Sequence, residues 1–205
     1  MRDVSALHSM TVEEYFRFEE SSPIKHEYVA GEVYAMSGAT SRHNLIAGTI
    51  FHVLLGAERS PCRVFMSGMR LEAANDKYYY PDVAVVCTPI AELDIVARGP
   101  CVVVEVTSPS TARIDRGEKL EAYRRILTLQ AYLIVDHRRR RVEHHWRETL
   151  DSAWHRDEIV SEAEAPIPIP CLDIDLTLDA IYRRVELPAV GESEGPDYET
   201  TEYDA

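Results

Sequence analysis

Two acidic residues lie within apolar runs of the sequence, where burial disfavours a free carboxylate. Asp82 opens the run 82–87, DVAVVC, and Glu105 lies inside the run 101–107, CVVVEVT. Both runs are rich in β-branched residues, which is typical of buried strands. A buried carboxylate is costly unless a partner compensates its charge, and a bound cation is a common partner where a protein does chemistry. We therefore expect a functional site at Asp82 and Glu105.

A divalent metal ion and a lysine would complete this chemistry. Neighbouring strands lie ~4.8 Å apart, so that the two acids can flank one point. Mg²⁺ is commonly held by one or two carboxylates, with water and phosphate oxygens in the rest of its shell. Asp115, Lys119 and Tyr123 follow at intervals of four residues, which places them on one face of a helix. A lysine aimed at the acids can stabilise a phosphate and the water that attacks it.

The order of these residues resembles the Uma2 family, also called DUF820. The resemblance rests on Pro81-Asp82, the run EVTSPST at 105–111, the set Asp115, Lys119 and Tyr123, the strand-like AYLIVD, and EYVAGEVYAMSGATSRHN at 27–44. The family belongs to the PD-(D/E)XK nuclease superfamily. The resemblance implies the α/β (α+β) class, with a restriction-endonuclease-like mixed β-sheet flanked by helices. It also implies an endonuclease that hydrolyses DNA phosphodiester bonds with Mg²⁺ or Mn²⁺.

The sequence departs from the superfamily pattern at one position. The superfamily's name implies a lysine two residues after the second acid, where this chain has Thr107. In Uma2-like sequences the lysine lies on the following helix, which makes Lys119 its replacement. Only three of the 22 basic residues are lysines, and a lysine pKa can shift whereas arginine stays protonated. The resemblance thus implies Asp82 and Glu105 as catalytic metal ligands and Lys119 as the third catalytic residue.

Further polar residues are candidates for supporting roles. Glu27 and Glu32 lie in a predicted hairpin, and each is either an additional carboxylate of the site or an exposed acid without a special role. His43 falls in the first turn of a predicted helix, where it can contact phosphate or metal-bound water or serve as a structural hydrogen-bonding group. Asp115 is expected to orient Lys119 rather than to bind metal.

Arginines form the best candidate for a phosphate-binding patch. Arg113 flanks the Lys119 helix, and Arg138, Arg139 and Arg140 follow the predicted strand AYLIVD. Guanidinium groups pair well with phosphate, whereas a solvated hairpin tip is the alternative interpretation. The run 78–80, three tyrosines, can stack on bases or divide between core and surface.

The composition indicates a globular protein with one domain over residues 1–185. The chain has 205 residues, of which 45% are hydrophobic and 28% charged. Residues 186–205 hold seven acids and neither lysine nor arginine, so this segment is expected to be a disordered, solubilising tail. The net charge of −13 argues against a simple nucleic-acid binder, although the tail supplies about half of it.

Several features of the sequence concern the cellular location, the state of the cysteines and the oligomeric state. No apolar run approaches the ~20 residues of a membrane span, and the N-terminus lacks the features of a signal peptide, so we expect a cytoplasmic protein without a membrane partner. The four cysteines show no Cys-x-x-Cys pair and are expected to be reduced core thiols rather than disulfides or zinc ligands. Cutting both strands of DNA takes two sites, which favours a homodimer.

Two other functions remain open on the sequence. A catalytically silent module could keep the fold to bind DNA or protein, which the acidic charge and Thr107 favour. A phosphodiesterase for small nucleotides would also suit the negative charge.

Overall fold

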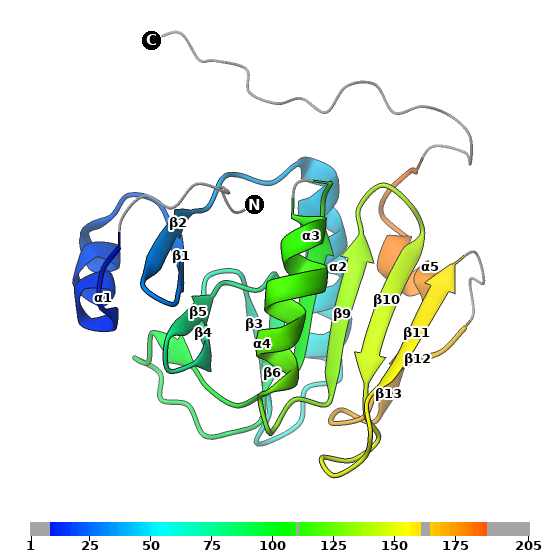
Figure 1. The fold of residues 1–205 in the computed structure, drawn as a ribbon. Coiled ribbons are helices and arrows are strands. Elements are labelled where there is room, and N and C mark those ends of the chain that lie inside the picture. The colour runs from blue at the N-terminus through cyan, green and yellow to red at the C-terminus, as the bar shows by residue number, and fades with distance from the viewer. Residues whose placement is uncertain (1–8, 110, 161–164, 188–205) are drawn as a thin grey trace, which may run out of the picture.

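A mixed six-stranded sheet forms the centre of the fold. The structure is a computed structural model that describes residues 9–109, 111–160 and 165–187 (Figure 1). The strands run in the order β11-β10-β9-β8-β6-β3. Their bounds are β3 (Arg63–Met66), β6 (Val83–Val86), β8 (Pro100–Thr107), β9 (Ala131–Asp136), β10 (Arg141–Trp146) and β11 (His155–Val160). Strands β8 and β9 are parallel, whereas their other neighbours pair antiparallel, which confirms the predicted mixed sheet.

Helices cover both faces of this sheet, because its central strands are apolar on both sides. Helix α2 (Ser41–Gly56) packs on one face together with α5 (Leu178–Tyr182) and the hairpin of β12 (Ile167–Ile169) and β13 (Ile174–Leu176). A helical crossover between β8 and β9 covers the other face, as Figure 1 shows. The α/β (α+β) class predicted from the sequence is confirmed.

The crossover is one continuous helical segment in three parts. It runs through α3 (Ala112–Ile114), the π-helical turn η1 (Asp115–Lys119) and α4 (Leu120–Arg124). Asp115, Lys119 and Tyr123 are all buried, so the predicted shared face exists. Single π-turns inside helices occur often at functional sites, because the wider turn redirects side chains.

A second, smaller sheet carries the N-terminal hairpin. Its order is β2-β1-β5-β4-β7, with β1 (His26–Val29), β2 (Glu32–Ala35), β4 (Arg70–Ala74), β5 (Lys77–Tyr79) and β7 (Val96–Ala97). Helix α1 (Val12–Ser21) begins with a capping box of Thr11 and Glu14. The turn of the hairpin has Ala30 and Gly31 at positive φ, as a tight turn requires.

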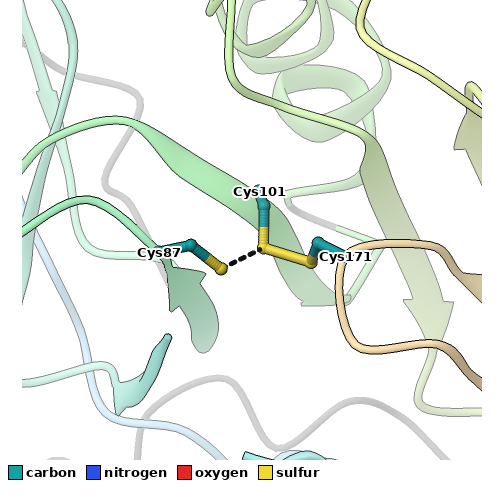
Figure 2. Close-up of side chains that lie close together, drawn as sticks. All are labelled: Cys87, Cys101 and Cys171. Atoms are coloured by element: carbon teal, nitrogen blue, oxygen red, sulfur yellow. Dashed lines mark hydrogen bonds between the residues drawn. A yellow bond between two sulfur atoms is a disulfide. The ribbon is translucent and has the colours of Figure 1, made fainter. Parts of the chain in front are cut away.

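The cysteines form two disulfides, Cys62–Cys87 and Cys101–Cys171, and the prediction of reduced thiols was wrong. Figure 2 shows the second disulfide with Cys87 beside it. Strand pairing explains the first: β3 and β6 pair antiparallel with Arg63 opposite Val86, so the next pair of residues is Cys62 and Cys87. This neighbourhood depends on long-range strand register, which the spacing of cysteines along the chain does not reveal.

Two further expectations concern the ends of the chain and the membrane. From residue 188 onward, the tail predicted at 186–205 lies outside the described residues. None of the helices in the described ranges is long and apolar enough to cross a membrane.

Acid is expected to destabilise the fold through His144 on β10. Its ring is fully buried and stacked on Trp146 with 5.8 Å between centroids, and neither ring nitrogen has a hydrogen-bond partner among the described residues. Burial lowers the pKa of His144 from 6.5 to about 3, because the charged ring loses its hydration. Below pH 6.5 the unfolded chain therefore binds a proton that the folded chain does not, and stability falls as the pH falls toward 3.

Urea unfolding between pH 7 and pH 5 measures this effect. We expect a loss of about 2 kcal/mol from this one group, since each pH unit below the unfolded pKa costs about 1.4 kcal/mol. The variant His144→Phe should lose that part of the slope, whereas His155→Phe, at an exposed position on β11, should keep it. An unchanged slope in His144→Phe would place the acid sensitivity in other groups.

Candidate active site

The two acids singled out in the sequence lie side by side at one end of the central sheet. Asp82 immediately precedes β6 and Glu105 lies within β8, and these antiparallel strands pair with Val83 opposite Val104. The backbone N–H of Val106 donates to Oδ2 of Asp82 at 2.7 Å. The register of the two strands therefore holds both carboxylates at one point.

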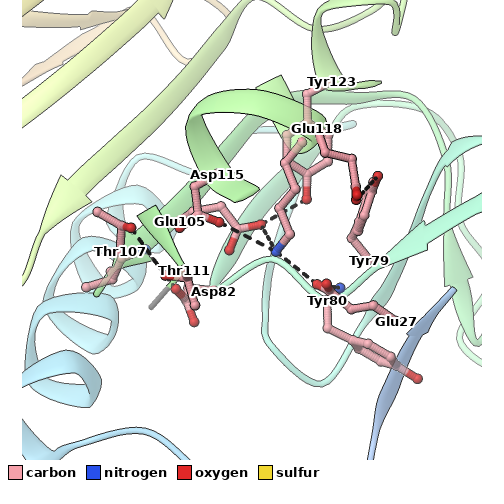
Figure 3. Close-up of polar contacts among 12 residues, drawn as sticks. Glu27, Tyr79, Tyr80, Asp82, Glu105, Thr107, Thr111, Asp115, Glu118 and Tyr123 are labelled. Carbon is pink, nitrogen blue, oxygen red and sulfur yellow. Dashed lines mark hydrogen bonds and ion pairs between the residues drawn. The ribbon is translucent and has the colours of Figure 1, made fainter. Parts of the chain in front are cut away.

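Lys119 reaches this point from the crossover. Its Nζ lies 2.9 Å from Oε1 of Glu105, 2.9 Å from Oε1 of Glu27 and 3.9 Å from Oδ1 of Asp115 (Figure 3). Glu27 comes from β1 of the smaller sheet, and Asp115 lies one turn before the lysine. One ammonium thus joins acids from three separate elements of the fold.

These groups are almost entirely removed from water. The relative exposures are 1% for Glu27, 6% for Glu105, 2% for Asp115 and 5% for Lys119. Burial raises the pKa of Glu105, and the nearby acids raise it further, whereas Lys119 opposes them. For Lys119, burial lowers the pKa but the three carboxylates outweigh it, so its pKa lies well above the usual value. Lys119 therefore stays protonated and acts as a fixed positive charge and donor, not as a base.

A layer of tyrosines supports the lysine and Glu105. The phenol of Tyr123 donates to Oε1 of Glu105 at 2.9 Å, and Tyr79 donates to Glu118 at 3.1 Å. The rings of Tyr79 and Tyr123 meet edge to face with 5.4 Å between centroids, and Nζ of Lys119 lies 5.5 Å from the centre of the Tyr79 ring. Burial, followed by the charge of Glu105, raises the pKa of Tyr123, so that its hydroxyl remains a donor.

His43 contacts the carboxylate oxygen of Asp82 that Val106 does not. The Nε2 atom of His43 lies 2.9 Å from Oδ1 of Asp82. His43 occupies the first turn of α2, whose N-cap Thr40 accepts a hydrogen bond from the His43 backbone N–H. Both carboxylate oxygens of Asp82 therefore have partners, one on each neighbouring element.

Thr107 forms part of the hydrogen-bonding environment of Asp115. It occupies the position where the superfamily's name implies lysine. Its hydroxyl lies 3.2 Å from that of Thr111, and both threonines hydrogen-bond to Asp115. These hydrogen bonds and Lys119 lower the pKa of Asp115, but burial outweighs them and the net shift is upward. Asp115 thus lies beside Lys119 in a shell of hydroxyl donors, which fits an orienting role.

A pocket opens over these residues. Its lining includes the carboxylates of Glu27, Asp82, Glu105 and Asp115 together with the ammonium of Lys119. The acids outnumber the lysine, and their oxygens are hard ligands of the kind that Mg²⁺ and Mn²⁺ prefer. Asp82 and Glu105 are the pair that could hold such an ion, because they lie next to each other at the adjacent strands β6 and β8.

The other residues predicted for the site lie partly in the pocket and partly elsewhere. Of the two hairpin acids only Glu27 lines the pocket, because Glu32 is exposed on β2, where Tyr34 donates to it. The interpretation of Glu32 as an additional carboxylate of the site was wrong, and the alternative of an exposed acid holds. The three tyrosines at 78–80 are all buried, which leaves no ring free to stack on a base. Both interpretations of this run, stacking on bases and division between core and surface, were wrong.

The predicted arginine patch is split by the fold. Arg138 and Arg139 line a second hollow that shares Ser108 with the main pocket and also includes Arg116. Arg113 is exposed on α3. Arg140 turns away to pair with Asp179 and lies over Tyr182, so it does not line either hollow. Its inclusion in the patch was wrong.

Comparison with known proteins identifies the family. The model of the Uma2 family, described as "Putative restriction endonuclease", matches residues 12–180. The chain belongs to the Uma2 family. This confirms the resemblance noted in the sequence, and the family description together with the nuclease-like fold supports a nuclease.

Relatives and a solved structure agree with this assignment. The chain is 32% identical to "Uncharacterized protein sll1609" of Synechocystis sp. over 167 residues, 79% of this chain and 94% of the relative. It is 37% identical to "Uncharacterized protein slr1290" of the same organism over 131 residues, 62% of this chain and 68% of the relative. The fold matches a crystal structure of a "putative nuclease belonging to DUF820" from Anabaena variabilis, with a TM-score of 0.68 and 16% identity, over 85% of this chain and 98% of that one.

Two residues of this Uma2 site were missed in the sequence. Tyr123 was noted for its spacing from Lys119 and as part of the family resemblance, but no role was assigned to it, although its hydroxyl lies beside Glu105. His137 lines the pocket because it follows β9, whose last residue Asp136 lies opposite Thr107 at the end of β8. The parallel pairing of β8 and β9 was the signal that could have revealed it.

Proposed function

We propose that this Uma2 protein is a metal-dependent endonuclease that hydrolyses phosphodiester bonds of DNA, with Mg²⁺ or Mn²⁺ as its cofactor. The supporting observation is the pocket that four carboxylates line, three of which contact one protonated lysine. A catalytically silent module has no evident use for an ammonium buried at 5% exposure among acids.

Each residue has a role that follows from its contacts. Asp82 and Glu105 would hold the divalent ion, which would supply Lewis-acid stabilisation of the phosphate and would lower the pKa of a bound water. Val106 and His43 keep the Asp82 carboxylate in position through contacts of 2.7 and 2.9 Å. Lys119 offers a positive charge where negative charge develops on the phosphate, and its contacts to Glu27 and Glu105 set its place.

The basic hollow beside the pocket favours an extended substrate. Arg116, Arg138 and Arg139 lie around it, and Ser108 belongs to both hollows. A phosphate in the second hollow would be a neighbour of the scissile phosphate along one strand. We assign DNA rather than a mononucleotide as substrate, because a mononucleotide has no further phosphodiester to place there. A homodimer would supply the second site for cutting the opposite strand.

Cleavage of supercoiled plasmid tests the proposal. Purified protein is expected to nick the plasmid with Mg²⁺ or Mn²⁺ and to be inactive in EDTA. The variant Asp82→Asn keeps the shape of the side chain but removes its charge, and should lose activity. Glu32→Gln, an exposed acid outside the pocket, should nick as the unaltered protein does. Cleavage that persists in EDTA or in Asp82→Asn would exclude this mechanism, and a small-nucleotide phosphodiester offered in parallel tests the alternative substrate.

A further inference from the structure

All four cysteines of the chain gather at the end of the central sheet opposite the acids. Cys62 precedes β3, Cys87 follows β6 and Cys101 is the second residue of β8, and these three strands are neighbours in the sheet. Cys171 reaches them from the turn between β12 and β13 (Figure 2). The chain has exactly four cysteines. All of its cysteine sulfur atoms therefore lie in one place, and four separate segments of the chain supply them.

The sulfur atoms approach one another beyond the two covalent pairs. Sγ of Cys87 lies 3.4 Å from Sγ of Cys101, although these residues belong to different disulfides. The sulfurs of Cys87, Cys101 and Cys171 all lie within 4.8 Å of one another, and Cys62 is bonded to Cys87. A tetrahedral ion with Zn–S bonds of about 2.3 Å separates its sulfurs by about 3.8 Å. The non-bonded separations of 3.4 Å between the sulfurs of Cys87 and Cys101 and of no more than 4.8 Å between those of Cys87 and Cys171 are compatible with that spacing.

We propose that the reduced form of this cluster binds one Zn²⁺ through Cys62, Cys87, Cys101 and Cys171. A two-electron reductant such as a dithiol converts each disulfide to two thiols, and each conversion takes up two electrons and two protons. Binding of Zn²⁺ then releases the four thiol protons and leaves four thiolate ligands around one ion, with a net charge of −2.

The surroundings suit such a negatively charged centre. The guanidinium of Arg59 donates to the carbonyl of Cys171 at 3.3 Å, and that of Arg63 donates to the carbonyl of Cys62 at 3.0 Å. Each arginine also pairs with an acid, Asp173 and Glu58 respectively, so the compensation is partial. Cys62 and Cys101 are each 4% exposed, and this burial strengthens the attraction between thiolates and ion.

The geometry favours a single structural zinc ion over other metal centres. Four thiolates fill a tetrahedral shell and leave no open position for substrate. A multinuclear iron–sulfur cluster places further atoms between its cysteine sulfurs and would need them farther apart. Soft sulfur ligands also separate this centre chemically from the oxygen-lined pocket at Asp82 and Glu105.

Because the cysteines lie on the strands that carry the acids, an ion bound to them would also affect the structure of the pocket. Strand β6 begins just after Asp82 and ends just before Cys87, and β8 carries both Cys101 and Glu105. One ion at the cysteines would therefore join β3, β6 and β8 at their far ends. It would hold the two strands that carry the acids in register without taking part in hydrolysis.

Cobalt substitution tests the site in the full chain. Protein reduced with a phosphine is titrated with Co²⁺, and sulfur-to-cobalt charge-transfer absorption is expected to saturate at one ion per chain and to vanish when Zn²⁺ is added. Cys171→Ser should lower the Co²⁺ affinity at least tenfold. Asp82→Asn should leave the signal unchanged, because the acid pocket contains no sulfur.

An alkylation experiment on the unaltered sequence keeps the test independent of whether cysteine variants fold. Zn²⁺ is expected to protect all four reduced thiols of the folded chain from a thiol-alkylating reagent, and a chelator should restore their modification. The proposal is overturned if the reduced chain gives no charge-transfer band, if zinc leaves the alkylation rate unchanged, if the disulfides of the folded chain resist the phosphine, or if metal analysis finds iron in place of zinc.

Discussion

Replacing Lys119 by methionine is expected to lower the rate of plasmid cleavage by about 10²- to 10³-fold, the usual loss when one preorganised donor to the developing charge is removed. Methionine keeps most of the length of the side chain but has no charge. Burial lowers the pKa of Lys119, but the three carboxylates raise it by more, so its ammonium is present throughout the neutral pH range. Single-turnover cleavage at saturating Mg²⁺ measures the change.

The same substitution is expected to reduce stability, with a characteristic dependence on pH. Without the ammonium, Glu27, Glu105 and Asp115 lose their shared partner in a buried site, at a cost of about 3–5 kcal/mol near pH 7. Part of this cost is proton uptake, because burial already raises the pKa of Glu105 to about 8 and Lys119 no longer opposes that shift. Acidification should recover part of this loss relative to the unaltered protein, because protonation removes the uncompensated charges. Urea unfolding of both proteins at several pH values gives the difference.

A matched control separates these effects from the loss of any lysine. Lys25 is exposed, donates to the carbonyl of Ser67 at 2.8 Å and does not line the pocket, although its ammonium lies 5.6 Å from the ring centre of Tyr80 at the pocket wall. Lys25→Met should leave both cleavage and the pH dependence of stability unchanged. If Lys119→Met cleaves as fast as the unaltered protein, the role assigned to this lysine is wrong. Lys119→Arg should not restore the rate, since the larger guanidinium does not fit the buried position.

Replacing Glu105 by glutamine is expected to abolish cleavage and to weaken Mn²⁺ binding by more than about 100-fold, because even partners outside the ligand shell contribute 10- to 100-fold. Glutamine keeps the volume and an oxygen that can accept from Lys119 and Tyr123, which both contact Oε1 of Glu105. It removes the negative charge that an ion needs. Isothermal titration of the disulfide-bonded protein with Mn²⁺ measures the affinity without free thiols.

The stability of Glu105→Gln distinguishes a functional acid from a structural one. Burial raises the pKa of Glu105, so the folded protein bears a cost for holding this carboxylate charged. The glutamine variant is therefore expected to be as stable as the unaltered protein or more stable, while it is inactive. Glu32→Gln should change neither property. A large loss of stability in Glu105→Gln would instead indicate that its ion pair with Lys119 mainly supports the fold.

Local patterns were enough to predict much of the architecture. The β-branched runs became β6 and β8, and the spacing of Asp115, Lys119 and Tyr123 placed them on one face. The proximity of Asp82 and Glu105 followed because short connections tend to join neighbouring strands. Each of these inferences depends on the chemistry of residues close to one another in the chain.

The tertiary structure alone decided which distant residues complete the site. Glu27 reaches Lys119 from the smaller sheet, His43 reaches Asp82 from α2, and Arg140 is drawn away by Asp179. No local pattern distinguishes Glu27 from Glu32.

The cysteine cluster also depends on contacts between segments that are distant in the sequence. Cys101 and Cys171 are 70 residues apart in sequence and meet only because the β12–β13 turn packs against the end of β8. The sequence by itself determined the acids, the lysine and the strands that carry them, since these follow from local composition and spacing. Packing between sheets, helices and turns decided which other groups share their environment, because contacts between remote segments depend on the summed burial of the whole chain.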